Sequence, residues 1–169
     1  MYWWLIDILV ESTARYLAMQ EKAGAQVLQI FESWAELLPE DVFDRIVTQP
    51  HARIIKRCRE LGVTVPFIGF PRGCGSLAEV YARGAGVDVV GLDVTASAEQ
   101  GKRLQETVAI QGNLDPLLLR AGGEALDRRV DQLLEQWGPS RYIFNLGHGV
   151  IPDTPIANIE RVLNRVTGG

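Results

Sequence analysis

The fold is decided by VAIQGNLDP (residues 108–116), in which an apolar run leads directly into a polar, glycine-containing loop closed by proline. The same arrangement recurs in YIFNLGHG (residues 142–149). In α/β proteins, a loop at the C-terminal end of a buried strand is where functional residues gather. The two stretches therefore indicate a fold class and two candidate sites.

Five such apolar, β-branched-rich runs occur along the chain, at residues 26–31, 65–70, 88–93, 108–111 and 142–146. They are nearly continuous rather than alternating between apolar and polar residues. This pattern is typical of strands that are buried on both faces of a parallel sheet.

The segments between these runs carry helical spacing. Residues 5–23 predict a helix closed by Gly24, and Ser76 with Glu79 forms a candidate capping box before a helix over residues 77–82. An apolar stripe at helical spacing predicts another helix; its members are Val130, Leu133, Leu134 and Trp137.

The last predicted helix has Thr154 as N-cap and Pro155 as its first residue. Its apolar face consists of Ile156, Ile159, Leu163 and Val166. Strand and helix thus alternate five times, which predicts right-handed βα units and a parallel sheet, either doubly wound or of the TIM-barrel type. In a barrel, the polar loops after all five strands would meet at one rim.

A complete TIM barrel needs eight strands and about 250 residues, whereas this chain has 169 residues and five candidate strands. No linker or low-complexity segment divides it, so residues 1–169 are predicted to form a single domain. The composition, 47% hydrophobic and 22% charged, indicates a globular protein with a sizeable core.

The net charge of −4, without a basic run, argues against a nucleic-acid partner. The apolar N-terminus is too short to span a bilayer, although Trp3 and Trp4 need a partner surface. Cys58 and Cys74 form neither a CxxC pair nor a zinc-ligand cluster. A reducing, cytoplasmic location is therefore expected.

His148 lies between two glycines, and its imidazole can act as a hydrogen-bond donor or cation for a substrate carboxylate; alternatively, it caps the following helix. Ser33, beside Glu32 and Trp34, can donate to a carboxylate or cap the next helix. No histidine adjoins Ser33 and no GxSxG elbow is present, which argues against nucleophilic catalysis.

Asn113 and Asp115 can each bond their own backbone as Asx-turns, so this loop is expected to set shape, although Asp115 could also act as a base. Arg72 directly follows a predicted strand and offers a cation for carboxylates, or belongs to a simple turn. Asp93 is the last residue of its predicted strand, and its side chain is expected to face the same rim. Alternatively, it forms an Asx-turn or pairs with a nearby arginine.

Together these motifs resemble uroporphyrinogen decarboxylase. The resemblance rests on VLQIFESWA (residues 27–35), VVGLD (89–93), QGNLDP (111–116) and NLGHG (145–149), in that order and over essentially the whole chain. It implies a partial TIM (β/α)8 barrel, in which five parallel strands, numbers four to eight of the family, alternate with helices.

The resemblance also implies the activity, which is conversion of uroporphyrinogen III to coproporphyrinogen III in heme biosynthesis by removal of four acetate carboxyl groups. It implies no cofactor and no metal, because the pyrrole ring itself accepts the electrons released with carbon dioxide. Ser33 matches the family's hydroxyl residue that contacts substrate, and His148 matches its carboxylate-contacting histidine. A homodimer is expected.

The family's N-terminal arginine-rich segment, its cation-stabilising aspartate and its tyrosine near the cleft have no counterpart here. The chain is therefore expected to be a C-terminal part whose catalytic groups lie elsewhere, and to be inactive alone. Exposed barrel edges predict self-association, an open five-stranded α/β layer of low stability, or complementation by an N-terminal chain.

Two other functions compete with this one. Zinc-dependent methyltransferases of the same superfamily have similar loops, but they need clustered His and Cys ligands, and neither Cys58 nor Cys74 follows a histidine by two residues. A non-catalytic half-barrel that acts by association is the other.

Overall fold

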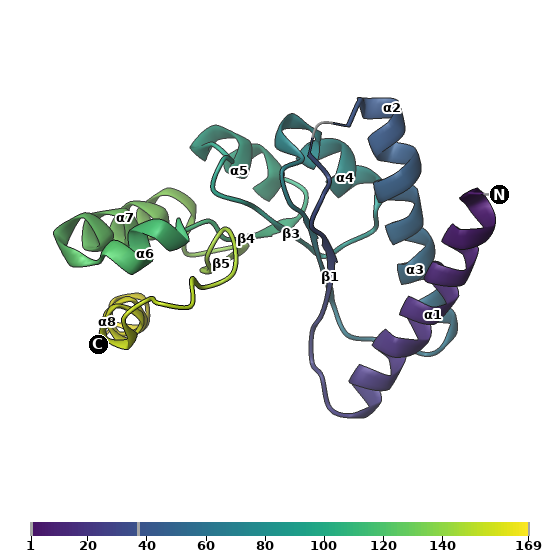
Figure 1. The fold of residues 1–169 in the computed structure, drawn as a ribbon, viewed down its shortest axis with the longest axis horizontal. Helices are drawn as coiled ribbons and strands as arrows, with labels where there is room; N and C mark the ends of the chain where they lie inside the picture. Colours follow the sequence, from purple (N-terminus) through teal and green to yellow (C-terminus); the bar gives the residue numbers. More distant parts are fainter. Residues whose placement is uncertain (1, 37, 169) are drawn as a thin grey trace. The chain divides into compact units, whose positions relative to one another are not determined.

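The computed structural model describes residues 2–36 and 38–168 of the chain (Figure 1). Five parallel strands alternate with helices, with the sheet order β1-β2-β3-β4-β5. This confirms the predicted fold class, five βα-type repeats of a partial TIM barrel. The chain divides into two compact units, an N-terminal unit (Met1–Val90) and a C-terminal unit (Gly91–Gly169), which we describe in turn.

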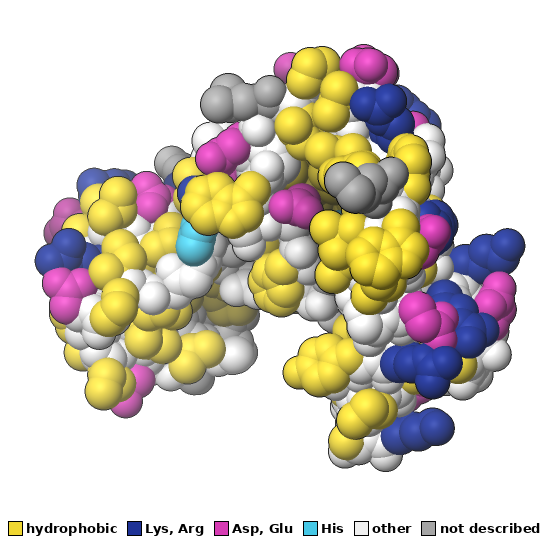
Figure 2. All heavy atoms as spheres, turned by 45° about the vertical axis from the view of Figure 1, so that its right-hand side comes forward, with side chains coloured by type: hydrophobic (Ala, Val, Ile, Leu, Met, Phe, Trp, Pro, Cys, Tyr) yellow, Lys and Arg dark blue, Asp and Glu magenta, His cyan; other side chains and the backbone are white. Residues whose placement is uncertain are grey.

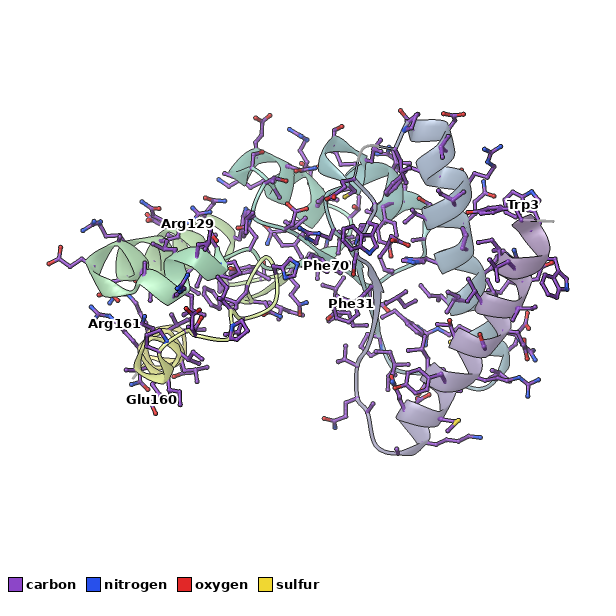
Figure 3. All side chains as sticks on the ribbon, in the orientation of Figure 1. Trp3, Phe31, Phe70, Arg129, Glu160 and Arg161 are labelled. Atoms are coloured by element: carbon purple, nitrogen blue, oxygen red, sulfur yellow. The ribbon has the colours of Figure 1, made fainter. Side chains whose placement is uncertain are left out.

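The first three strands are β1 (Leu28–Glu32), β2 (Phe67–Pro71) and β3 (Val89–Gly91). Each begins one or two residues after the first residue of its predicted run. In the pairing of β1 with β2, Leu28 lies opposite Phe67 and Glu32 lies opposite Pro71. The first three residues of β2 are buried, as expected for a strand covered on both faces. By contrast, Phe31 on β1 is 64% exposed, and its ring contacts that of Phe70 on β2 edge to face (Figure 3).

The helical elements of the N-terminal unit are α1 (Tyr2–Lys22), α2 (Glu40–Phe43), a π-helical turn η1 (Asp44–Thr48), α3 (Gln49–Glu60), a 3-10 turn η2 (Gly75–Leu77) and α4 (Ala78–Gly84). The first confirms the predicted N-terminal helix, and Gly24 closes it with a positive φ of 106°. The predicted capping box is wrong. Helix α4 starts at Ala78 directly after the 3-10 turn, so its N-cap is Leu77 rather than Ser76.

Helices α1 and α3 lie side by side and are joined by two ion pairs (Figure 1). Arg53 binds Asp7 at 2.5 Å, and one turn further along both helices Arg57 binds Glu11 at 2.8 Å. Because both pairs advance in the same direction, the two helices run parallel, as successive βα units require. The hydrogen bonds from Arg57 and then Arg15 lower the pKa of Glu11 to about 2.

A buried His–Tyr pair lies in the helical layer over β2. Tyr81 of α4 is fully buried, and its hydroxyl is 2.7 Å from Nδ1 of His51 on α3. The ring crosses β2 so closely that a Cβ on Gly69 would lie 2.0 Å from the Tyr81 oxygen. Burial lowers the pKa of His51 to about 4 and raises that of Tyr81.

The C-terminal unit contains α5 (Ala98–Gln105), β4 (Ala109–Gln111), α6 (Pro116–Ala121), α7 (Gly123–Trp137), β5 (Tyr142–Ile143) and α8 (Ile156–Thr167). Strand β5 has two residues rather than the predicted five, and an isolated bridge between Leu114 and Leu146 continues its direction. Helix α7 buries Val130, Leu133 and Trp137 of the predicted stripe. The Trp137 indole donates to the carbonyl of Ala98 at the start of α5, at 3.2 Å.

Two bidentate Arg–Asp pairs join α8 to α7. Arg161 binds Asp127 at 2.6 and 2.5 Å, and Arg165 binds Asp131 at 2.5 Å through both nitrogens (Figure 3 labels Arg161). The hydrogen bonds from Arg161 and Arg165 lower the pKa values of Asp127 and Asp131, respectively. These two helices also run parallel, because both pairs advance by four residues on each helix.

The predicted start of the last helix is wrong by one residue. Pro155 rather than Thr154 occupies the N-cap, so Ile156 is the first helical residue. Thr154 is instead buried, and its hydroxyl finds no hydrogen-bond partner among residues 2–36 and 38–168. The threonine is therefore a packing residue of the preceding turn.

Candidate functional site

Ser33 directly follows β1 in the N-terminal unit and is exposed. Its turn is fixed by the Glu32 carboxylate, which accepts from the backbone N–H of Trp34 at 3.1 Å. The alternative that Ser33 caps the next helix is wrong, because α2 has Pro39 as its N-cap. The Ser33 hydroxyl is thus a surface group at the C-terminal end of a parallel strand.

Arg72 brings a cation to the same loop. Its backbone N–H extends the strand pairing by donating to the carbonyl of Glu32, and its guanidinium donates to the carbonyl of Ser33 at 3.3 Å. The ion pair with Glu36 is long, at 4.0 Å. The predicted turn is also present, because Cys74 N–H donates to the carbonyl of Pro71. Ser33 and Arg72 are therefore brought together.

In the C-terminal unit, Asp93 and Asp115 shape their own loops. The Asp93 carboxylate accepts from both the backbone and the hydroxyl of Thr95, at 2.8 and 2.6 Å. Asp115 is the N-cap of α6 and accepts from Leu117 N–H at 2.8 Å, with Pro116 as the first helical residue. Both turn interpretations are confirmed.

Asn113 behaves differently from the prediction. Instead of bonding its own backbone, its amide donates to the carbonyls of Asp93 and Ala96, at 2.8 and 3.1 Å. Nothing in the local spacing of residues signals this contact, because the partners lie 20 and 17 positions earlier in the chain. The contact of Asn113 with Asp93 and Ala96 is the feature of these loops that sequence reasoning missed.

His148 is exposed on the loop after β5. Its Nδ1 accepts from the backbone N–H of Gly149 at 2.6 Å, so the neutral ring carries its proton on Nε2. The alternative that His148 caps the next helix is wrong, because the N-cap of α8 is Pro155. The arrangement leaves an N–H donor that can bind a carboxylate.

Metal binding and membrane insertion are the two remaining points. Within residues 2–36 and 38–168, no three His, Cys, Asp or Glu side chains are grouped as metal ligands would be. Cys58 is buried, with its thiol 3.6 Å from the carbonyl of Ala14. None of the helices in the described part of the chain combines the length and apolarity needed to span a membrane.

Comparison with known proteins places these loops in a family. The model of the uroporphyrinogen decarboxylase family matches residues 4–168. The uroporphyrinogen decarboxylase of Phenylobacterium zucineum is 64% identical over 97% of this chain, and that of Caulobacter vibrioides is 63% identical, also over 97%. The chain spans about half the length of these relatives, 48% and 47%.

A solved structure shows the same fold. A methyltransferase from Methanosarcina mazei superimposes with a TM-score of 0.79 over 96% of this chain and 48% of its own, at 21% sequence identity. At that identity the likeness concerns the fold alone. From the family match over residues 4–168, this chain belongs to the uroporphyrinogen decarboxylase family.

Proposed function

We propose that this chain is the C-terminal part of a uroporphyrinogen decarboxylase, which converts uroporphyrinogen III to coproporphyrinogen III in the cytoplasm. The observation that carries the proposal is the 64% identity over 97% of the chain to a relative of that name. The sequence prediction of a single domain over residues 1–169 is part of this proposal.

The proposed chemistry needs positioning rather than a metal or cofactor. Protonation of a pyrrole carbon gives a cationic ring, which accepts the electron pair left when the acetate C–C bond breaks and carbon dioxide departs. The protein then has to hold anionic side chains of the substrate and stabilise the cation. Of these tasks, the residues of this chain suit the binding of substrate carboxylates, because they offer hydrogen-bond donors.

We assign carboxylate contacts to Ser33 and His148, each in its own unit. Ser33 is exposed, and the Arg72 guanidinium donates to the backbone carbonyl of Ser33 at 3.3 Å. His148 offers Nε2–H because Gly149 N–H occupies Nδ1. Neither residue is proposed to donate the proton to carbon or to stabilise the pyrrole cation, and those tasks are assigned to residues outside this sequence.

The test is complementation. The chain is mixed with a separately produced N-terminal half of the Caulobacter vibrioides enzyme, and coproporphyrinogen formation is measured after oxidation to the fluorescent porphyrin. Activity is expected from the mixture and from neither part alone. Ser33→Ala and His148→Ala should lower activity by about tenfold or more, as expected when a charge-assisted hydrogen bond is lost.

Ser76→Ala serves as the matched control, because Ser76 is an exposed serine in the 3-10 turn after β2 and has no proposed contact with substrate. It should retain the activity of the unaltered mixture. A mixture that assembles but makes no coproporphyrinogen would contradict the proposed activity. Full activity of the unmixed chain would contradict the placement of the catalytic groups.

We also propose that the chain associates with itself through uncovered apolar surfaces. Figure 2 shows hydrophobic side chains gathered in groups on the face it presents. Exposed apolar residues of α1 include Trp3, Trp4, Leu5, Ile8 and Leu9, and those of β1 and the adjoining loop are Val27, Phe31 and Trp34.

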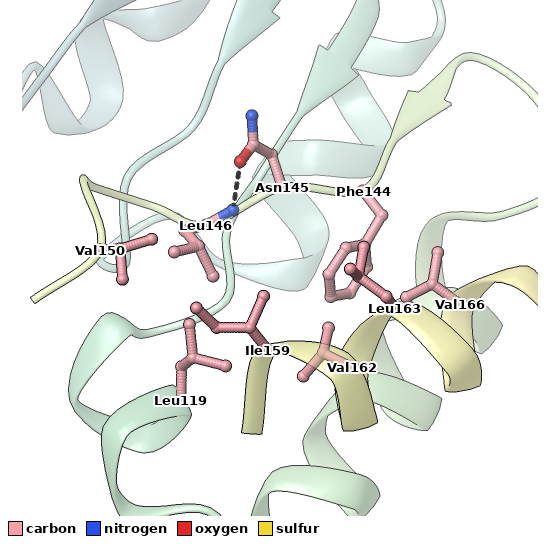
Figure 4. A pocket seen from close by; sticks show the side chains of 9 residues that line it. All are labelled: Leu119, Phe144, Asn145, Leu146, Val150, Ile159, Val162, Leu163 and Val166. Carbon is pink, nitrogen blue, oxygen red and sulfur yellow. Dashed lines mark hydrogen bonds between the residues drawn. The ribbon is translucent and has the colours of Figure 1, made fainter. Parts of the chain in front are cut away.

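The C-terminal unit carries an apolar pocket. It has a volume of about 280 Å³ and lies between the loop after β5, the end of α6 and one face of α8 (Figure 4). Phe144, Leu146, Ile159 and Leu163 are among its lining residues. Surfaces of this kind on a soluble chain favour association.

A further inference from the structure

Three loops of the C-terminal unit interlock beside His148. They follow β3 (residues 93–96), β4 (residues 112–115) and β5 (residues 145–149). Asn113 in the second loop donates to two carbonyls of the first, and Gly147 in the third donates to the carbonyl of Leu114 in the second, at 2.8 Å. The carbonyl of Asn145 in turn accepts from Leu114 N–H at 3.1 Å.

The Asn113 side chain is a clamp built from its two amide hydrogens. It is 2% exposed, and the hydrogens bind the carbonyls of Asp93 and Ala96, three residues apart. Its Oδ1 has no hydrogen-bond partner within the described ranges 2–36 and 38–168. The amide therefore acts on the first loop only as a donor. Without it the carbonyls of Asp93 and Ala96 each lose this hydrogen bond, and the Asp93 carbonyl keeps the bond from Ala96 N–H at 3.2 Å.

Gly147 packs directly onto the segment that Asn113 holds. A Cβ at this position would lie 2.6 Å from the backbone nitrogen of Val94 and 3.0 Å from the carbonyl carbon of Asp93. These are backbone atoms, so a side chain there could not be accommodated by a rotamer change. The place of residue 147, and with it the start of the His148 backbone, is set by residues 93–94.

We propose that Asn113 is a positioning residue for His148. It fixes residues 93–96, Gly147 rests against them, and the imidazole that follows is held with Nδ1 on Gly149 N–H and Nε2–H directed away from that bond. The inference rests on the proposed role of His148 as a carboxylate donor. It adds that the donor is preorganised by an amide that does not itself contact substrate.

The experiment reads the His148 ring directly. In the full chain labelled with ¹⁵N-histidine, long-range ¹H–¹⁵N spectra at about pH 8 distinguish the two tautomers. The unaltered chain is expected to show a single tautomer protonated on Nε2. Asn113→Ala is expected to show a mixture of both tautomers, because Gly149 N–H no longer meets a fixed Nδ1.

Asn158→Ala is the matched control. The Asn158 amide also donates to two backbone carbonyls of the C-terminal unit, those of Leu119 and Arg120 at 2.9 and 3.0 Å, but at the end of α6. It should leave the ring signals unchanged although it removes the same number of hydrogen bonds. If the control alters the tautomer as much as Asn113→Ala does, a general loss of stability is the cause and the positioning role is wrong.

Gly147→Ala places a Cβ against residues 93–94 and serves as the test if Asn113→Ala does not fold. It should give a mixture of both tautomers although the Asn113 amide is unchanged. Unchanged ring signals in a folded Asn113→Ala chain, or in a folded Gly147→Ala chain where the first variant is unfolded, would overturn the proposal. Adding uroporphyrin to the unaltered chain tests the carboxylate role of His148 separately. If the ring signals of His148 do not change on addition, that role is refuted, whereas the tautomer result is unaffected.

Discussion

At the scale of single residues, the buried His51–Tyr81 pair links stability to pH. His51 has a pKa of about 4 in the folded chain and about 6.5 when unfolded. Because the folded-state pKa is the lower one, the unfolded chain binds the proton first as the pH falls. The contribution of the buried, neutral His51 to the free energy of unfolding is therefore complete above about pH 6.5 and is lost progressively down to about pH 4.

We expect the free energy of unfolding to fall by about 2 kcal/mol between pH 7 and pH 5 from this histidine alone. His51→Gln should remove this part of the pH dependence, because glutamine does not titrate and its amide can still accept from the Tyr81 hydroxyl. Urea unfolding of both chains at the two pH values measures it. Equal pH dependence in the two chains would show that His51 is not the group responsible.

At the scale of elements, α8 is held on α7 by Arg161 and Arg165. The folded-state pKa values of Asp127 and Asp131 are lowered, so their stabilisation is present above the ordinary range of an aspartate and is lost as the pH falls through the folded values. Asp127 is the more enclosed, with 18% of its side chain exposed against 51% for Asp131, and both arginines approach it.

Asp127→Asn should therefore accelerate amide hydrogen exchange in α8 more than Asp131→Asn does, by several-fold, and high salt should reduce the difference. Glu124→Gln is the control, because the ion pair of Glu124 is with Arg128 of the same helix, at 3.3 Å, and its side chain is 88% exposed. The same exchange rates in all three variants would mean that these pairs do not hold the helix.

At the scale of the whole molecule, the proposed self-association through exposed apolar residues predicts the oligomeric state in solution. Sedimentation velocity should show a dimer or larger species whose share grows with concentration. Phe31→Lys should weaken this association, because a charge on an exposed strand opposes edge-to-edge pairing. Glu106→Lys, at an exposed position outside the apolar surfaces, is the control. A concentration-independent monomer would contradict self-association.

Much of the fold was predictable from the sequence because its signals are local. Five continuous apolar runs separated by helical spacing predicted five parallel strands, and residues 5–23 predicted α1 to within a few positions. The predictions that failed concern ends of elements. Ser76 and Glu79 have the right spacing for a capping box, but a 3-10 turn precedes α4, and this depends on how the loop after β2 packs.

The candidate site divides in the same way. Sequence alone determined that Ser33, Asn113 and His148 stand on loops after strands, because the order of apolar and polar residues sets where strands end. Only the tertiary structure decided that Asn113 holds residues 93–96, that Arg72 reaches the carbonyl of Ser33 and that neither Ser33 nor His148 caps a helix. These contacts join loops that are far apart in the chain, and parallel strand pairing, rather than any spacing of residues, brings such loops together.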